Sequence, residues 1–97
     1  MRLDVFLKTS RLIPRRSLAQ KFCSSGLVMI DGVETKASKE VKTGDEIEIA
    51  RGTKRAKYRV LNVPSRKQMS KSEAAGMTEL IGETELDEFH GLSPDLT

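Results

Sequence analysis

Residues 1–32 read MRLDVFLKTSRLIPRRSLAQKFCSSGLVMIDG, and this stretch decides the fold. Within its first ten residues, Leu3, Phe6 and Leu7 recur at helical spacing, so we predict a short helix with one apolar face. Asp4 lies near the start of this helix, where a carboxylate can accept hydrogen bonds from free N–H groups or orient a neighbouring arginine. We therefore expect a structural role for Asp4.

A second helix is predicted from about Pro14 to Ser25. Proline suits the first turn of a helix, and the residue before it disfavours helical geometry, so the first helix should end by Ile13. Gly26 is expected to close the second helix in the left-handed conformation. Four apolar residues of this helix share one face and should pack on the core: Leu18, Ala19, Phe22 and Cys23.

Strands and turns follow the helix pair. Residues 27–30 are apolar and β-prone, and Asp31-Gly32 after them is a favoured hairpin turn. Residues 46–49 alternate polar and apolar side chains, which indicates a half-buried strand. Residues 51–55 are expected to form a basic loop. Residues 57–63 are predicted to form another strand, which Pro64 ends.

These elements predict one small α+β domain, built from a helix pair, a β-hairpin and a sheet. We assign residues 1–64 to this domain, with its core motif at 1–49. Residues 65–82 are expected to be a short helical extension, with a helix within 70–81 that Gly82 stops. Residues 83–97 are acidic and are expected to be a disordered, flexible tail.

Charge is distributed unevenly along the chain. Residues 1–67 contain 16 Lys/Arg and 7 Asp/Glu, a net charge of +9, whereas residues 68–97 contain one Lys and 7 Asp/Glu, a net charge of −6. A strongly basic segment favours a polyanionic partner, most often a nucleic acid. The alternative is a surface that is basic only for solubility.

Several classes of function are not supported by the sequence. Cys23 is the single cysteine, so no disulfide within the chain and no zinc spacing can be built, and we expect it to pack in the core. His90 has no metal-binding partner, and no serine has a histidine base, so we expect no cofactor, no metal and no enzyme. Charged residues interrupt the N-terminus, which argues against a signal peptide, and no run could span a membrane. We expect a cytoplasmic protein.

Basic residues of the helix pair and of the loop after the hairpin are the candidate RNA contacts. They are Arg2, Arg11, Arg15, Arg16, Lys21 and Lys36. The guanidinium fork binds phosphate through paired hydrogen bonds, and four aromatic residues are too few for a base-stacking platform, so recognition should be of RNA shape and backbone. A second candidate set comprises Arg51, Lys54 and Arg55, which could instead only discourage edge-to-edge strand pairing.

An ordered series of motifs in the first half of the chain resembles the S4-type RNA-binding domain. These motifs are Arg2–Leu7, Ser10–Arg11, Arg15–Ala19, Gly26–Gly32, Lys36–Ser38 and Val41–Ile47. A stand-alone chain of this size is similar to a ribosome-associated group that includes a fifteen-kilodalton heat-shock protein and the RqcP family of bacterial ribosome quality-control factors. The start Met1–Asp4 and the segment Glu73–Met77 look closest to the RqcP family.

The resemblance implies binding to large-subunit rRNA and to tRNA on large ribosomal subunits that are obstructed by peptidyl-tRNA. Arg2 and Arg16 occupy the positions that contact RNA in that family. The resemblance also implies cooperation with an RqcH-type factor, which adds C-terminal alanines without mRNA, and no chemical step by this chain. We expect a monomer away from the ribosome and no membrane partner.

Three alternatives stay open at this point. One is a heat-shock-type factor that rescues large subunits carrying nascent chains, although the acidic tail favours the quality-control role. Another is an RNA-guiding subunit of an RNA-modifying enzyme. The third is a DNA-binding regulator.

Overall fold

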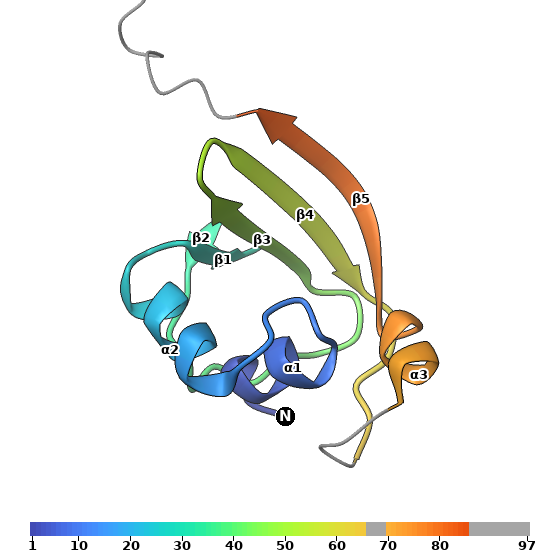
Figure 1. Cartoon of the computed structure of the whole chain (residues 1–97). Helices are drawn as coiled ribbons and strands as arrows, with labels where there is room; N and C mark the ends of the chain where they lie inside the picture. Colours follow the sequence, from blue (N-terminus) through green and yellow to red (C-terminus); the bar gives the residue numbers. More distant parts are fainter. Residues whose placement is uncertain (66–69, 86–97) are drawn as a thin grey trace, which may run out of the picture.

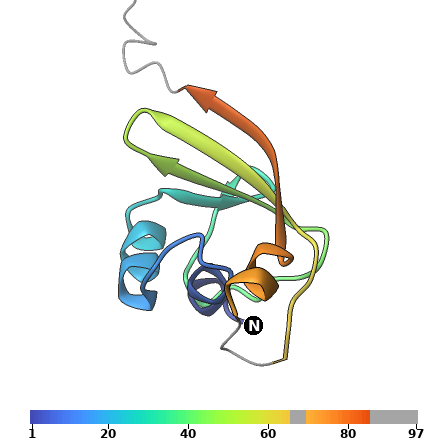
Figure 2. The same ribbon diagram turned by 45° about the vertical axis from the view of Figure 1, so that its right-hand side comes forward.

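The computed structural model describes residues 1–65 and 70–85. It shows the predicted α+β architecture: an antiparallel five-stranded sheet with the helix pair packed on one of its faces (Figures 1 and 2). The helices are α1 (Leu3–Thr9), α2 (Arg16–Ser24) and α3 (Lys71–Ala75). The strands are β1 (Val28–Ile30), β2 (Val33–Glu34), β3 (Glu46–Arg51), β4 (Lys54–Val60) and β5 (Thr78–Glu85), in the spatial order β2-β1-β3-β4-β5.

The hairpin between β1 and β2 forms where the sequence predicted it. Asp31 and Gly32 both have positive φ angles, 52° and 83°, as a two-residue turn that follows the twist of the strands requires. An Asp31 side-chain oxygen also accepts a hydrogen bond from the Glu46 amide at 3.2 Å, which ties the turn to β3. Gly26 has a φ of 74° after α2, so its predicted left-handed conformation is confirmed.

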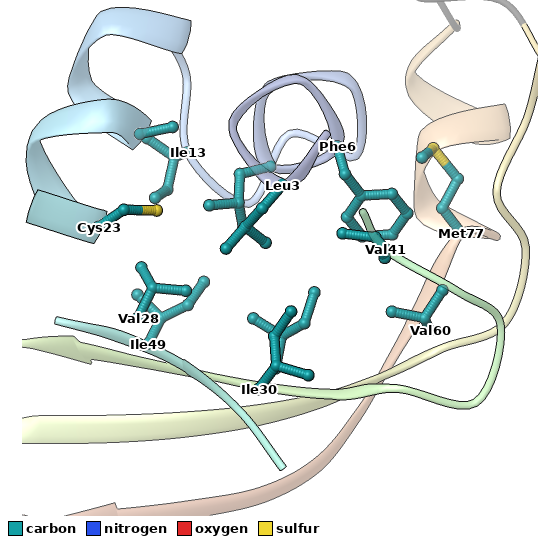
Figure 3. Close-up of a cluster of buried hydrophobic side chains, with 13 residues drawn as sticks. Leu3, Phe6, Ile13, Cys23, Val28, Ile30, Val41, Ile49, Val60 and Met77 are labelled. Atoms are coloured by element: carbon teal, nitrogen blue, oxygen red, sulfur yellow. The ribbon is translucent and has the colours of Figure 1, made fainter. Parts of the chain in front are cut away.

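The core lies between the helix pair and the sheet (Figure 3). Leu3, Phe6 and Leu7 are fully buried, which confirms the apolar face predicted for the first helix. Cys23 is a free, buried thiol packed in this core. Burial raises its pKa to about 11, so it stays protonated at neutral pH. Leu18 and Phe22 of the predicted stripe are only partly buried at the edge of the core.

The C-terminal part of the sheet differs from the prediction. The helix expected within residues 70–81 ends at Ala75, and the chain from Thr78 forms β5, which pairs with β4 along its whole length. Fully buried Met77 anchors this change of direction. Pairing with β4 therefore overrides the local helical signal, and Gly82 lies in a strand instead of ending a helix.

Two further boundaries are corrected by the same sheet. Residues 83–85, expected to begin the disordered tail, belong to β5, while residues 86–97 of that predicted tail lie outside the described residues. The basic loop expected at 51–55 is a tight hairpin instead, in which Gly52 has a φ of 57° and β4 begins at Lys54. Glycine permits this turn because it lacks a Cβ.

Replacement of Met77 tests how firmly β5 is joined to the core. We expect Met77→Ala to lower the free energy of unfolding by about 2–5 kcal/mol, because it leaves a cavity in the core. Leu80→Ala on the same strand is the control. Leu80 is 54% exposed, so its loss should change stability by about 0.5 kcal/mol or less. Urea unfolding followed by circular dichroism measures both, and equal effects would show that the segment is only loosely attached.

Candidate nucleic-acid interface

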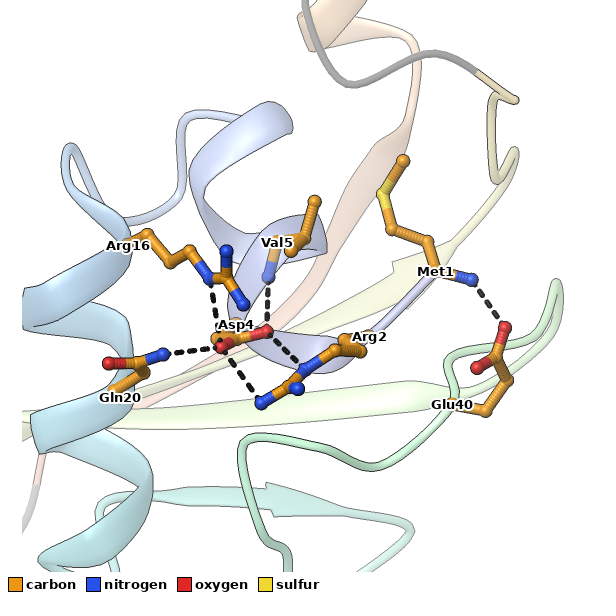
Figure 4. A network of polar contacts seen from close by, with 7 residues as sticks. All are labelled: Met1, Arg2, Asp4, Val5, Arg16, Gln20 and Glu40. Carbon is orange, nitrogen blue, oxygen red and sulfur yellow. Dashed lines mark hydrogen bonds and ion pairs between the residues drawn. The ribbon is translucent and has the colours of Figure 1, made fainter.

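The polar centre of the helix pair is the carboxylate of Asp4, which is fully buried at the start of α1 (Figure 4). Its Oδ1 accepts hydrogen bonds from the Val5 amide at 2.8 Å and from Arg2 Nε at 3.2 Å. Its Oδ2 accepts from Gln20 Nε2 at 2.8 Å, from Arg16 Nε at 3.1 Å and, at 3.4 Å, from Arg2 Nη2. One side chain therefore joins the start of α1 to one face of α2.

These donors determine the ionisation of the buried acid. Burial alone would raise the pKa of Asp4, but the hydrogen bonds from Gln20, Arg16 and the Val5 amide, together with the positive charge of Arg16, lower it below its ordinary value of 3.8. Asp4 is therefore a carboxylate at neutral pH and acts only as an acceptor. The predicted structural role of Asp4 is confirmed, in its arginine-orienting form.

Asp4 holds both arginines in place, but their side chains remain partly exposed to solvent. The side chains of Arg2 and Arg16 are 47% and 49% exposed, although both contact an acid with no exposed surface. Among the described residues, neither Nη atom of Arg16 nor Nη1 of Arg2 has a hydrogen-bond partner. These N–H groups remain available to an external anion, and a fork-shaped donor matches phosphate oxygens in particular.

Arg2 and Arg16 also line one hollow of the surface. It has a volume of about 380 Å³ and continues along Met1, Val5 and Glu40. The Met1 ammonium group is paired with the Glu40 carboxylate, so this rim of the hollow is itself neutralised. The arrangement offers two fixed cations beside a concave surface, which suits a phosphate backbone better than a flat peptide surface.

The other predicted contacts surround the arginine pair without joining it. Arg11 is exposed in the turn after α1, where its φ is 64°, and Arg15 is exposed at the N-cap of α2. Lys21 is exposed on α2, and Lys36 is exposed in the loop after β2. The structure therefore divides the predicted set into two arginines fixed by Asp4 and four more dispersed cations.

The structure places the three residues of the second predicted set in different environments. Arg51 donates a hydrogen bond to the Leu12 carbonyl, and its guanidinium lies 5.9 Å from the centre of the Phe22 ring. Arg51 thus ties the β3–β4 hairpin to the helix pair. Lys54 is exposed on β4, and Arg55 is partly buried there, where its Nε has no hydrogen-bond partner among the described residues.

The sequence did not reveal the contribution of Gln20. Its amide makes one of the two shortest hydrogen bonds to Asp4, but it appeared in the sequence only as one polar residue on the exposed face of α2. The available signal was weak: Arg16 and Gln20 are four residues apart, so they lie on the same side of a helix. Nothing local indicated that this side would face an acid from α1.

Two other kinds of site find no support in the part of the chain that is described. No helix there is long and apolar enough to cross a lipid bilayer. No three His, Cys, Asp or Glu side chains within residues 1–65 and 70–85 come together as a metal-binding group.

Comparison of the sequence with known proteins identifies the family of this chain. Residues 1–47 match the S4 domain family. The RQC P-site tRNA stabilizing factor of Streptococcus pneumoniae is 39% identical over 91% of this chain and 98% of its own length. The factor of the same name from Bacillus subtilis is 42% identical over 91% of this chain and all of its own length.

A solved structure supports the fold independently. The trimeric structure of heat shock protein 15 from Vibrio cholerae superposes with a TM-score of 0.76 at 26% identity, covering 84% of this chain and 81% of that protein. The resemblance first noticed in the motifs therefore extends over most of the chain, including the sheet that follows them.

Replacement of Asp4 by asparagine removes the charge that orders both arginines. We expect Asp4→Asn to cost roughly 1.5–3 kcal/mol of unfolding free energy at neutral pH, as for buried hydrogen bonds to a charged group. Because the folded chain lowers the pKa of Asp4, this stabilisation is fully present above pH 3.8 and disappears as the pH falls through the lowered value. Urea unfolding at several pH values tests the prediction. A difference between wild type and variant that grew on acidification would contradict it.

Replacement of Arg51 tests whether this residue stabilises the fold through its internal contacts. We expect Arg51→Ala to destabilise the fold by about 1 kcal/mol, because it removes a hydrogen bond and a cation–π contact. Lys54→Ala, which removes the same charge from exposed β4, should change stability by about 0.5 kcal/mol or less. Thermal unfolding monitored by circular dichroism compares them. Equal stability of the two variants would return Arg51 to the candidate RNA contacts.

Proposed function

The chain belongs to the family of RQC P-site tRNA stabilizing factors, and we propose that it binds large-subunit rRNA and tRNA during ribosome quality control. The arginine pair held by Asp4 is the observation that carries this proposal. It places two half-exposed guanidinium groups, with N–H donors to spare, beside one hollow. The names of its relatives supply the setting, a tRNA in the P site.

Phosphate is the group that this surface would recognise. A guanidinium that already donates Nε to a carboxylate has a fixed direction, and its remaining donors can form paired bonds to one phosphate. Two such groups, anchored on the same acid but supplied by different helices, can read the spacing between phosphates on a folded RNA. Arg11, Arg15, Lys21 and Lys36 would add attraction that depends on salt.

The proposed mechanism has no chemical step. By binding rRNA and tRNA together, the protein would favour one position of the tRNA over others, because a ligand shifts an equilibrium towards the state that it binds better. The finer parts of the proposal are that the subunit is obstructed by peptidyl-tRNA and that an RqcH-type factor then adds alanines to the nascent chain. The cytoplasm is the compartment in which we propose that it acts.

The heat-shock relative supports a second candidate function. Its structure is similar over most of both chains, so rescue of large subunits that carry nascent chains is the alternative. That protein forms a trimer in its structure, whereas we propose a monomer here. Identity of 39% and 42% to two RQC factors, against 26% to the heat-shock protein, favours the quality-control role.

Co-sedimentation tests the proposed site directly. Wild-type protein carrying a tag should travel with free large subunits that hold peptidyl-tRNA in a gradient of cell lysate. We expect Arg2→Ala/Arg16→Ala to reduce this association at least roughly tenfold, since hydrogen bonds to charged groups contribute about 1.5–3 kcal/mol each.

Lys42→Ala/Lys71→Ala is the matched control, because it removes two exposed positive charges outside the proposed contacts. It should retain most of the association and show the same melting curve as wild type. Equal loss in both double variants would mean that only total charge matters. Absence of the wild-type protein from the large-subunit fractions at low salt would refute the ribosomal proposal itself.

A further inference from the structure

The loop after β2, residues 35–39, is joined to the polar centre of the helix pair. The Leu3 amide donates to the Lys39 carbonyl at 2.8 Å, and the Asp4 amide donates to the Ala37 carbonyl at 3.1 Å. The backbone that positions the buried carboxylate therefore also positions this loop. The end of β2, which precedes the loop, lies near α2, because Glu34 and Gln20 line one hollow.

Two adjoining hollows connect Gln20 of α2 with the β1–β2 hairpin. The first, of about 380 Å³, begins at Gln20 and runs to Glu34, Thr35 and Lys36. The second, of about 580 Å³, has those last three residues in its wall and extends to the β1–β2 hairpin. Because Gln20 donates to Asp4, a strand of RNA held by the arginine pair could continue into both hollows.

The second hollow is lined by two apolar side chains, two lysines and two acids. Ile30 and Val33 supply the apolar wall, and Val33 is the most exposed large apolar side chain of the described chain, at 66%. Lys36 and Lys39 also line this hollow, and both are exposed. The volume lies within the range of roughly 300–1,000 Å³ that is usual for sites that enclose a small molecule.

Two acids also line this hollow, but each has another contact. Asp31 accepts a hydrogen bond from the Glu46 amide at 3.2 Å. The carboxylate of Glu34 lies against Gly26, where an added Cβ would be 3.3 Å from its atoms. Neither contact removes the charge of the acid, so the lining as a whole is neutral, and Lys36 and Lys39 are the groups in it that can attract a phosphate.

We propose that this hollow takes one unpaired nucleotide of the bound RNA, with its base against Ile30 and Val33 and its phosphate near Lys36 and Lys39. The inference rests on the proposed RNA-binding function and adds a subsite to it. Proteins that recognise folded RNA commonly bind bases that are splayed out of the helix, because only these expose their faces and edges. RNA is favoured over a protein segment as the occupant by Lys36 and Lys39, and by the adjoining hollow at Gln20, whose amide donates to the same acid as the arginine pair.

Three short RNA hairpins test the subsite. Their stems are identical except that one carries a single bulged adenosine, one carries an abasic nucleotide at the same bulge, and one is fully paired. Wild-type protein should bind the adenosine bulge roughly fivefold to tenfold more tightly than the abasic bulge, since contact with one base contributes about 1 kcal/mol or more. Fluorescence anisotropy at fixed salt measures the three affinities.

Variants of the apolar wall then locate the effect. Val33→Asp should abolish the preference for the base over the abasic site, whereas Leu61→Asp should preserve it. Leu61 is the matched control because it is also apolar and exposed, at 45%, and lies outside both hollows. Val33→Thr keeps the shape and β-propensity of the side chain and should weaken the preference even if the aspartate variant folds poorly.

The outcomes separate the two proposals. Wild-type binding to all three hairpins without any preference for the base would overturn the subsite and leave the RNA-binding function intact. A preference that survives in both Val33 variants would also overturn the subsite, because the base would then lie elsewhere. Failure of the wild type to bind any hairpin or large subunits would refute the proposed function itself.

Discussion

The buried carboxylate of Asp4 is the interaction on which the helix pair depends. A charge without exposed surface is costly unless every lone pair has a partner, and here two arginines, one glutamine and one backbone amide provide them. Because these donors come from the start of α1 and from α2, the two helices can satisfy the acid only in one relative position. The same backbone turn holds the loop at residues 37–39.

The sheet gives this polar centre a rigid support. Core residues from α1 and α2 pack on β1, β3 and the end of β4, so the helix pair cannot shift without disturbing the apolar cluster (Figure 3). Arg51 also connects the β3–β4 hairpin to Leu12 and Phe22. Meanwhile β5 adds an acidic strand to basic β4, with Glu79 opposite Arg59 and Glu85 opposite Lys54. The sheet is thus partly neutralised, whereas the helix pair keeps its excess of positive charge.

Local signals in the sequence predicted most of the first half of the fold. Three of these signals each act within a few residues: the helical spacing of Leu3, Phe6 and Leu7, the Asp31-Gly32 turn, and Gly26. The local structure that they produce could therefore be predicted without knowledge of the tertiary fold. The strand at Thr78–Glu85 could not be predicted in this way, because it forms through pairing with β4, about 25 residues earlier in the chain. The same holds for the site. Its arginines could be recognised from the sequence as candidate phosphate contacts. Their shared attachment to Asp4 could not, because it depends on the packing of the two helices; Arg16, for example, is 12 residues from Asp4 in the chain.

Attachment to an acid also changes what the arginines can contribute to binding. Two free arginines would attract any polyanion, but each would lose side-chain freedom on binding, and that loss weakens the association. Asp4 cancels one of the two positive charges and restricts both side chains before a ligand arrives. The expected result is less non-specific attraction and more dependence on the spacing of phosphates, which is a suitable balance for a protein that must distinguish one arrangement of RNA among the many that a ribosome presents.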